Sequence, residues 1–473
     1  MSSIINKNIF IKNVLPSEQI LGTKYDYSNC KNKMEQYAFV CPTNGEYSDE
    51  NGAGKNPDNR TQERFDEYKA CGFDVLLILG NDKYSGEDFN SSQLKKNLDM
   101  AYKSGLKTVV YDSRLHDLSA RDKAIVGDVY ASMEELTAFV KECMTPYMSH
   151  PAFYGVTLYD EPRFMHLPAV GEITRAVKAV DENIFVHTCL LPYFASVDYG
   201  LLDFRTSCDG AGDEETTTAY KRYIGEHLDR TGANYVAYDN YPIFYSRGET
   251  TICFTYFHNL QMTTNVAKAH GAKIDLTIQT YADFKSEMRW CDEDDIRFQA
   301  MAALAFACCN ISYFTYWMFP WRTNSGICQA IMDDKGNKLC YYETQRVNEL
   351  CQKLYAVTSN FEYAGTNLYT TGEEPQLFEL VEREDFESIK SVNASVPTLC
   401  NRLFDKERGV EAFMLVNSSD PYKKLNDVVE IEFNNKSKAV VYVNGTPEYI
   451  GLDDGKLSLN ISCGDGVIII PID

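Results

Sequence analysis

The sequence predicts a (β/α)8 barrel followed by an antiparallel β-sandwich, and three observations support this fold class. Up to about residue 360, short apolar runs alternate with segments of helical periodicity. These runs are nearly continuous, as in parallel strands that are buried on both faces. Beyond residue 360 the runs become shorter and β-rich, with turn residues between them. We therefore expect one barrel and one sandwich within the 473 residues.

The barrel strands are predicted, in order, from eight apolar runs. A stretch of helical periodicity separates each run from the next, and residues 344–357 supply a helix after the eighth. Eight such units fit a closed barrel better than an open doubly wound sheet. The predicted strands are Tyr37–Pro42, Phe73–Leu79, Leu106–Tyr111, Phe153–Tyr159, Ile184–Cys189, Tyr235–Tyr238, Ile274–Ile278 and Ile311–Tyr316.

Glycines mark where the helices must end. Gly72, Gly105, Gly232 and Gly271 each stand one to three residues before a predicted strand, which is the usual place for a helix C-terminus. The segment after the first strand, Cys41-Pro-Thr-Asn-Gly-Glu, does not match the glycine-rich phosphate loop of dinucleotide-binding folds. A nucleotide-binding fold is therefore the weaker prediction.

The C-terminal part reads as a sandwich of about 110 residues. We expect an N-terminal extension over residues 1–34, the barrel over 35–358 and the sandwich over 359–473. Asn/Gly/Asp/Ser turns such as NSSDP and DDGK separate the β-rich runs. These runs are Gln376–Val381, Val410–Val416, Val428–Phe433, Ala439–Val443, Leu457–Ile461 and Gly466–Ile470.

Composition excludes several classes of partner. The formal net charge of −22 repels phosphate backbones and anionic lipid, so neither nucleic acid nor a membrane is expected as a partner. No apolar stretch approaches 18 residues, and the polar N-terminus does not resemble a secretory signal. The 15 cysteines are dispersed and form no CxxC pair, which favours reduced thiols in the cytoplasm, without disulfides or zinc. We expect no cofactor, and the sequence leaves the oligomeric state open.

Candidate site residues follow the predicted strands, because barrel active sites lie at the C-terminal strand ends. Carboxylates, an amide and aromatic rings at one mouth are typical of a carbohydrate site. The predicted catalytic residues are Glu161, Asp160 and Asp239, and the predicted substrate contacts are Trp317, Tyr241, Gln279, Asp112 and His187. The alternatives to a functional role are helix capping or orientation of a neighbouring group for Asp160 and packing for His187 and Trp317.

Three segments carry a resemblance to a known group of enzymes. YGVTLYDEP, YVAYDNYPIF and RFQAMAALAFACCNISYFTYW resemble bacterial (β/α)8 glycoside hydrolases of the clan A type, including β-galactosidase-like proteins of family 42 character, over residues 35–360. The resemblance implies that Glu161 is the general acid/base and that Trp317 lines the subsite of the reacting sugar. Two positions depart from that pattern. Asp160 replaces the usual Asn, and Gln279 stands where the nucleophilic Glu ends strand seven; Glu287 lies eight residues beyond it.

The Asp160–Glu161 pair suggests a second resemblance, to substrate-assisted hexosaminidases such as those of families 20 and 123. That resemblance implies that Asp160 positions a 2-acetamido group and that no protein nucleophile is needed. A third possibility is inversion, with Asp239 activating water. Two further classes stay open. One is a non-catalytic carbohydrate-binding protein on a decayed barrel. The other is a lyase or a metal-dependent hydrolase, which the absence of paired-His ligand patterns disfavours.

Overall fold

The computed structural model describes residues 14–42, 46–49, 52–55, 57–80, 92–195, 212–246, 248–318 and 327–473. Its centre is a parallel barrel, as the sequence predicts. The hydrogen-bonded order is β7-β6-β5-β4-β1-β14-β12-β9-β8, and β7 and β8 are consecutive pieces of one strand, so the sheet closes on itself. The barrel strands are β1 (Tyr37–Ala38), β4 (Val75–Gly80), β5 (Lys107–Tyr111), β6 (Phe153–Thr157), β7 (Phe185–His187), β8 (Cys189–Leu190), β9 (Tyr235–Asp239), β12 (Lys273–Gln279) and β14 (Asn310–Phe314).

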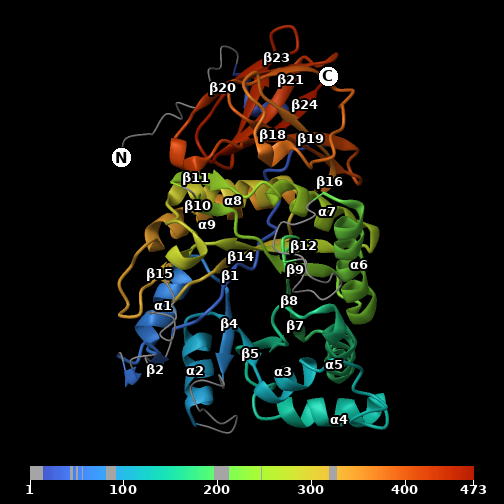
Figure 1. Ribbon diagram of the computed structural model, residues 1–473. Helices are drawn as coiled ribbons and strands as arrows, with labels where there is room; N and C mark the ends of the chain where they lie inside the picture. The colour runs from blue at the N-terminus through green and yellow to red at the C-terminus, as the bar shows by residue number, and fades with distance from the viewer. Residues whose placement is uncertain are drawn as a thin grey trace.

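Helices connect these strands and cover the outside of the barrel (Figure 1). Side chains at their ends explain where several of them begin: Thr61, Ser132, Asp213 and Asp292 each accept a backbone N–H of the first turn. The helices are α1 (Gln62–Ala70), α2 (Ser92–Lys103), α3 (Ser113–Ser119), α4 (Met133–Met144), α5 (Leu167–Val180), α6 (Glu214–Thr231), α7 (Tyr256–Ala269), α8 (Glu293–Ala305) and α9 (Tyr341–Thr358).

Glycine has a physical role at two of the predicted helix ends. Gly232 ends α6 with φ of 65°, the left-handed conformation in which glycine avoids a Cβ penalty. Gly72 has φ of 106°, and a Cβ there would lie 2.8 Å from the Cβ of Asn348 in α9. At both positions the chain turns from a helix into the next strand, and any residue larger than glycine would be strained there.

The C-terminal part is a sandwich of two antiparallel sheets, as predicted. One sheet has the order β16-β18-β19-β24-β21-β22 and the other β17-β20-β23. One predicted strand is wrong: residues 376–378 form a short 3-10 helix, η5, that covers the barrel helix α7. The strands are β16 (Glu362–Tyr369), β17 (Ile389–Asn393), β18 (Thr398–Asp405), β19 (Val410–Asn417), β20 (Asp427–Phe433), β21 (Lys438–Val443), β22 (Thr446–Gly451), β23 (Lys456–Ile461) and β24 (Gly466–Ile472).

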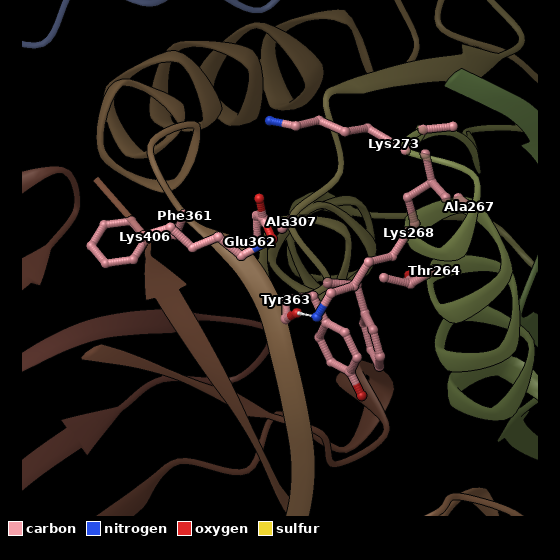
Figure 2. A pocket seen from close by; sticks show the side chains of 13 residues that line it. Thr264, Ala267, Lys268, Lys273, Ala307, Phe361, Glu362, Tyr363 and Lys406 are labelled. Carbon is pink, nitrogen blue, oxygen red and sulfur yellow. Dashed lines mark hydrogen bonds and ion pairs between the residues drawn. The ribbon is translucent and has the colours of Figure 1, made fainter. Parts of the chain in front are cut away.

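Barrel and sandwich pack directly on one another, with α8 between them (Figure 1). Asn401 of β18 donates to the carbonyl of Ala305 at the end of α8. Beside it, Lys268 of α7 donates to the carbonyl of Tyr363 in β16, across the pocket drawn in Figure 2. Residues 14–34 lie along the sandwich before entering the barrel, and the Tyr27 hydroxyl donates to Asp405. Part of the six-stranded sheet therefore shares the apolar core of the barrel, whereas a separate core includes residues of both sheets of the sandwich.

Short strands lie in the connections between the barrel elements. They are β2 (Glu46–Asp49), β3 (Gly52–Lys55), β10 (Ile243–Ser246), β11 (Glu249–Ile252), β13 (Ala282–Asp283) and β15 (Ile327–Gln329).

None of the helices that the structure describes is long and apolar enough to span a bilayer. The cysteines whose side chains are described are free thiols.

Candidate active site

The exit of strand β6 carries the Asp160–Glu161 pair to the barrel mouth, meaning the C-terminal ends of the strands. Beyond the strand, the N–H of Leu158 donates to the carbonyl of His187 at 2.9 Å, and the N–H of Glu161 donates to the carbonyl of Cys189 at 2.9 Å. The pair is therefore held against the neighbouring strand. Glu161 has φ of 50°, a left-handed conformation that is unfavourable for a non-glycine residue by roughly 1–2 kcal/mol. Such strain concentrates at functional positions.

Asp239 ends strand β9 and faces the same carboxylates. Only 5% of it is exposed, and its Oδ1 has no hydrogen-bond partner within the described ranges. Burial raises its pKa well above the usual range, and the negative charges of Glu161 and Asp160 raise it further, whereas a hydrogen bond from Tyr241 opposes the shift. The structure thus brings together the three acidic residues predicted as catalytic.

Asp160 and Glu161 reach solvent, in contrast to Asp239. Even so, the protein around Asp160 removes enough water to raise its pKa to about 7, and the charge of Glu161 adds to this. The thiol pKa of Cys189 is raised by burial and then by the charges of the same three carboxylates, which confirms that they share one neighbourhood. Burial and the repulsion between these carboxylates thus favour the protonated forms of Asp239 and Asp160.

An aromatic wall adjoins this cluster. The ring of Tyr241 lies 5.2 Å from that of Tyr281 and 5.6 Å from that of Phe314, and the last two lie 4.9 Å apart. Tyr241 and Phe314 are only partly buried. Tyr241 was a candidate from the sequence, but Tyr281 and Phe314 were missed. The sequence could have identified them as aromatic residues at or just beyond the ends of strands seven and eight. Such a wall can pack against the apolar face of a sugar.

Gln279, a predicted substrate contact, makes its side-chain hydrogen bonds within the protein. It is fully buried. Its Oε1 accepts the N–H of Ile243 at 2.9 Å, and its Nε2 donates to the carbonyls of Ile243 and Tyr281, both at 3.1 Å. The amide therefore joins the exit of β12 to the start of β10, which follows β9. No side-chain hydrogen at Gln279 is left for a sugar.

Asp112, the second predicted contact, is also committed to the protein. It is fully buried and caps α3. Its carboxylate accepts from the backbone and guanidinium of Arg114 at 2.7–3.0 Å and from the Tyr147 hydroxyl at 2.9 Å. A carboxylate with four protein donors and no exposed surface stabilises the local fold and lies outside the candidate site.

His187 and Trp317 lie inside the protein. His187 is 1% exposed and packs edge-on against Tyr37 and Phe39, each at 5.6 Å; burial lowers its pKa to about 3, so it is neutral. Trp317 has no exposed surface, and the Arg64 guanidinium lies 5.9 Å from its ring. A fully buried ring cannot stack on a sugar in this conformation, so the structure does not place Trp317 in the site.

The sequence has one further carboxylate beyond strand seven, Glu287, and two further tryptophans, Trp290 and Trp321. Glu287 is exposed in the turn after β13, where its carbonyl accepts the N–H of Tyr245. Trp290 is 46% exposed, and Trp321 lies outside the described residues. Across the described part of the chain, no three His, Cys, Asp or Glu side chains are arranged to hold a metal ion.

Comparisons with known proteins find similarity at the level of structure. No protein-family model matches the chain, and no curated protein sequence matches it significantly. Similar solved structures include a protein described as a glycoside hydrolase, with 13% identity, a TM-score of 0.49, and 87% of this chain and 89% of that chain covered. A family 5 glycoside hydrolase from Bacteroides vulgatus has 12% identity and a TM-score of 0.49, with 87% and 85% covered.

A family 27 β-L-arabinopyranosidase from Geobacillus stearothermophilus is similar at 10% identity and a TM-score of 0.47, with 96% of this chain and 98% of that chain covered. Similarity at this level decides neither the reaction nor the substrate. The function must therefore be argued from the residues at the barrel mouth.

Proposed function

We propose that this chain is a glycoside hydrolase in which Glu161 donates a proton to the leaving oxygen of a glycosidic bond. The observation that supports this most is the carboxylate cluster of Asp160, Glu161 and Asp239 beside an aromatic wall, in which burial and like charges raise the pKa values of Asp160 and Asp239. Glu161 is the proposed donor because it is exposed at the strand exit, whereas Asp239 is 5% exposed. A general acid must both hold a proton and reach the substrate.

The commitment of Gln279 to the fold favours a mechanism without a protein nucleophile on strand seven. Two such mechanisms follow from the site: substrate assistance through a 2-acetamido group that Asp160 orients, and inversion with Asp239 as the base. A base must be ionised, and the pKa of the buried Asp239 is raised well above its usual range. Asp160, whose pKa is raised to about 7, ionises more readily. We therefore favour a substrate-assisted N-acetylhexosaminidase.

In the proposed reaction, Glu161 protonates the glycosidic oxygen as its bond to the anomeric carbon breaks. The carbonyl oxygen of the substrate's own 2-acetamido group forms the new bond to that carbon. Ionised Asp160 accepts the amide N–H and so orients the group. The new bond closes a ring, so the intermediate is cyclic. In the second step Glu161 takes a proton from a water molecule as the water oxygen attacks the anomeric carbon. The bond from the acetamido oxygen to that carbon breaks, and the free sugar is released. The aromatic wall would hold the apolar face of the sugar.

The test is a panel of nitrophenyl glycosides that carry either a 2-acetamido or a 2-hydroxy group. We expect turnover of the 2-acetamido substrates by the native protein and a large loss in Glu161→Gln and Asp160→Asn. Glu287→Gln is the matched control, since this exposed carboxylate lies in a loop after a neighbouring strand. Turnover of 2-hydroxy glycosides alone would exclude substrate assistance. Sugar binding without any turnover would support a non-catalytic carbohydrate-binding protein and contradict the proposal.

A further inference from the structure

A second cavity lies at the opposite end of the barrel, where the strands begin. Its volume is about 180 Å3, and its lining includes Tyr37, Phe185, Tyr235, Asp275 and Asn310. The first four stand at or near the starts of β1, β7, β9 and β12, and Asn310 is the first residue of β14. Since all barrel strands are parallel, this end is the far side of the barrel from Glu161 and Asp239. The candidate active site does not use it.

Asp275 is the central polar group of this cavity. It is 2% exposed, and its carboxylate accepts hydrogen bonds from the Tyr37 hydroxyl at 2.7 Å, Asn310 Nδ2 at 3.1 Å and Ser312 Oγ at 3.3 Å. All three donors are neutral. No lysine or arginine in the described ranges pairs with it. A buried carboxylate of this kind keeps its charge at a cost unless a cation accompanies it.

Asn310 adds a second acceptor. Its Nδ2 is committed to Asp275, and this fixes the orientation of the amide because the oxygen would face a carboxylate if it were reversed. The residue is 8% exposed, and its Oδ1 is buried without a donor among the residues that the structure describes. A buried acceptor without a donor costs about 1–3 kcal/mol. Two adjacent acceptors therefore favour a ligand that carries several N–H donors and a positive charge.

The lysines around the cavity already have carboxylate partners. Lys33, which lines the cavity, lies 2.6 Å from Asp74, and Lys107 pairs with Glu35. Asp74 also pairs with Lys69, at 2.6 Å, so these ion pairs together carry one excess positive charge. Asp275 itself makes no ion pair with a lysine or arginine in the described part of the chain.

The rest of the wall is aromatic. The rings of Tyr154 and Phe185 stack at 5.1 Å with 10° between their planes, and those of Phe185 and Tyr235 at 5.4 Å with 5°. Both tyrosine hydroxyls are engaged, Tyr154 donating to Glu35 and Tyr235 to the carbonyl of Val186. Both faces of the Phe185 ring are covered within the stack, and Lys107 Nζ lies 4.3 Å from the centre of the Tyr154 ring. Carbon surface for the apolar part of a ligand therefore remains at the ring edges and at Tyr235.

We propose that this cavity binds a small primary ammonium compound with a short apolar tail. Its ammonium group donates to Asp275 and to Asn310 Oδ1, and its tail packs against the stack of Tyr154, Phe185 and Tyr235. A volume of about 180 Å3 equals that of about six water molecules, at roughly 30 Å3 each, so the ligand has about five to seven non-hydrogen atoms. This proposal is independent of the proposed glycosidase activity.

The pocket in Figure 2 is a useful contrast, because its charge is the opposite. Its volume is about 290 Å3, and Lys268, Lys273 and Lys406 line it beside one carboxylate, Glu362. Lys268 donates to the Tyr363 carbonyl, and Lys406 lies 2.5 Å from Glu362. An ammonium compound should avoid this lysine-rich pocket. Glu362→Gln therefore serves as a control variant for Asp275→Asn.

The proposed binding depends on pH through Asp275. Burial raises the pKa of Asp275 to about 6, and a protonated carboxyl no longer attracts a cation. The pKa of Cys309 is raised to about 12, and burial raises the pKa values of Tyr37, Tyr154 and Tyr235 further above 10, so all four stay neutral below pH 8. Glu35 and Lys33 face the same cavity in their ion pairs, and Lys273 precedes Asp275 on β12.

The experiment measures binding of n-butylammonium chloride to the full-length protein by calorimetry at pH 7.5, with 1-butanol as a neutral molecule of equal length and KCl as a simple cation. We expect saturable binding of butylammonium alone. Asp275→Asn should weaken it by roughly 10- to 100-fold, the range expected for a lost charge-assisted hydrogen bond. Glu362→Gln should leave it unchanged.

The native protein gives a second readout if Asp275→Asn does not fold. Its affinity for butylammonium should fall about tenfold for each pH unit below 6, because protons compete for Asp275. Absence of butylammonium binding would overturn the proposal, as would equal affinity for butanol or displacement of butylammonium by K⁺ at equal concentration. So would an affinity that is constant between pH 7.5 and 5. Failure of these tests would leave the glycosidase proposal untouched, because they do not involve a sugar.

Discussion

Asp239 closes strand β9 at the barrel mouth, whereas Asp275 lies near the start of the adjacent strand β12, at the opposite end. Both are buried and both have raised pKa values, but the causes differ. The pKa of Asp239 is raised by burial and then by the negative charges of Glu161 and Asp160. Its Oδ1 has no hydrogen-bond donor in the described part of the chain. The pKa of Asp275 is raised by burial, and hydrogen bonds from three neutral donors partly oppose that rise.

The difference separates a reactive group from a binding group. At the mouth, burial and mutual repulsion favour protonated carboxyl groups, as the proposed general-acid chemistry requires. At the other end, neutral donors hold the Asp275 carboxylate in a fixed place, and the second acid that lines the cavity, Glu35, is paired with Lys107. If the two ends are independent, changes at the mouth should affect catalysis, and changes at Asp275 should affect stability and its pH dependence.

The largest effect is expected at the mouth. Glu161→Gln removes the proposed proton donor while preserving size, and should lower kcat/KM on an unactivated glycoside by roughly 10²–10⁴-fold, the usual contribution of a general acid. An activated aryl glycoside with a good leaving group needs little protonation and should lose much less. Kinetics on both substrates check this. Full activity of the variant on an unactivated disaccharide would falsify the assignment.

The next effect concerns the exit of β12. Gln279→Glu replaces a donor to two carbonyls by a buried carboxylate, so it should lower the free energy of unfolding by roughly 3–5 kcal/mol without creating a retaining enzyme. Urea unfolding of the variant and the native protein measures the loss. If the variant were as stable as the native protein and gained a covalent glycosyl intermediate, our structural role for Gln279 would be wrong.

The third prediction tests the bottom of the barrel through pH. The folded pKa of Asp275 is about 6, against a reference of 3.8, so folding takes up a proton between these values. The stabilisation is complete below pH 3.8 and is lost as pH rises through about 6, by roughly 3 kcal/mol for a shift of about two pKa units. Asp275→Asn should remove this part of the pH dependence.

Urea unfolding between pH 4 and 8 measures that change. Asp465→Asn in the sandwich is the matched control, because Asp465 is also buried and its pKa is also raised. It should leave the contribution of Asp275 in place. An unchanged pH profile in Asp275→Asn would contradict the assigned cause.

The sequence predicts the barrel well because its strands are local apolar runs, and Gly72 and Gly232 mark turns by their own conformational needs. It predicts the position of Asp160 and Glu161 for the same reason: they follow the apolar run of β6. What it cannot show is which distant donor reaches a polar side chain. Asp112 and Gln279 also lie at strand ends, but distant donors already bind their side chains. Asp112 accepts a hydrogen bond from Tyr147, 35 residues away, and Gln279 accepts one from the N–H of Ile243, 36 residues earlier.

The same limit explains the error in the sandwich. The run Gln376–Val381 has the apolar content of a strand, but Leu377 and Phe378 are buried in a short helix that packs on α7. The aromatic residues at the mouth illustrate it again. Phe314 and Trp317 are three residues apart at the end of strand eight, and only the structure shows that the former is partly exposed while the latter is fully buried.

That last pair gives the smallest expected effect. Phe314→Leu removes an aromatic face from the wall beside Tyr241 and Tyr281, and an aromatic contact of this kind contributes about 0.5–1.5 kcal/mol beyond the area it buries. KM for the preferred glycoside should therefore rise about two- to tenfold, with kcat nearly unchanged, because a sugar held equally in the ground state and the transition state affects binding alone.

Trp317→Phe is the matched variant, since it shortens a buried ring three residues away. It should leave KM unchanged and lower stability instead, because it opens space in the core around Tyr316 and Arg64. Steady-state kinetics and urea unfolding on both variants distinguish the two roles. A rise in KM for Trp317→Phe with none for Phe314→Leu would restore Trp317 as the sugar platform and would mean that substrate uncovers a ring that is buried in the free protein.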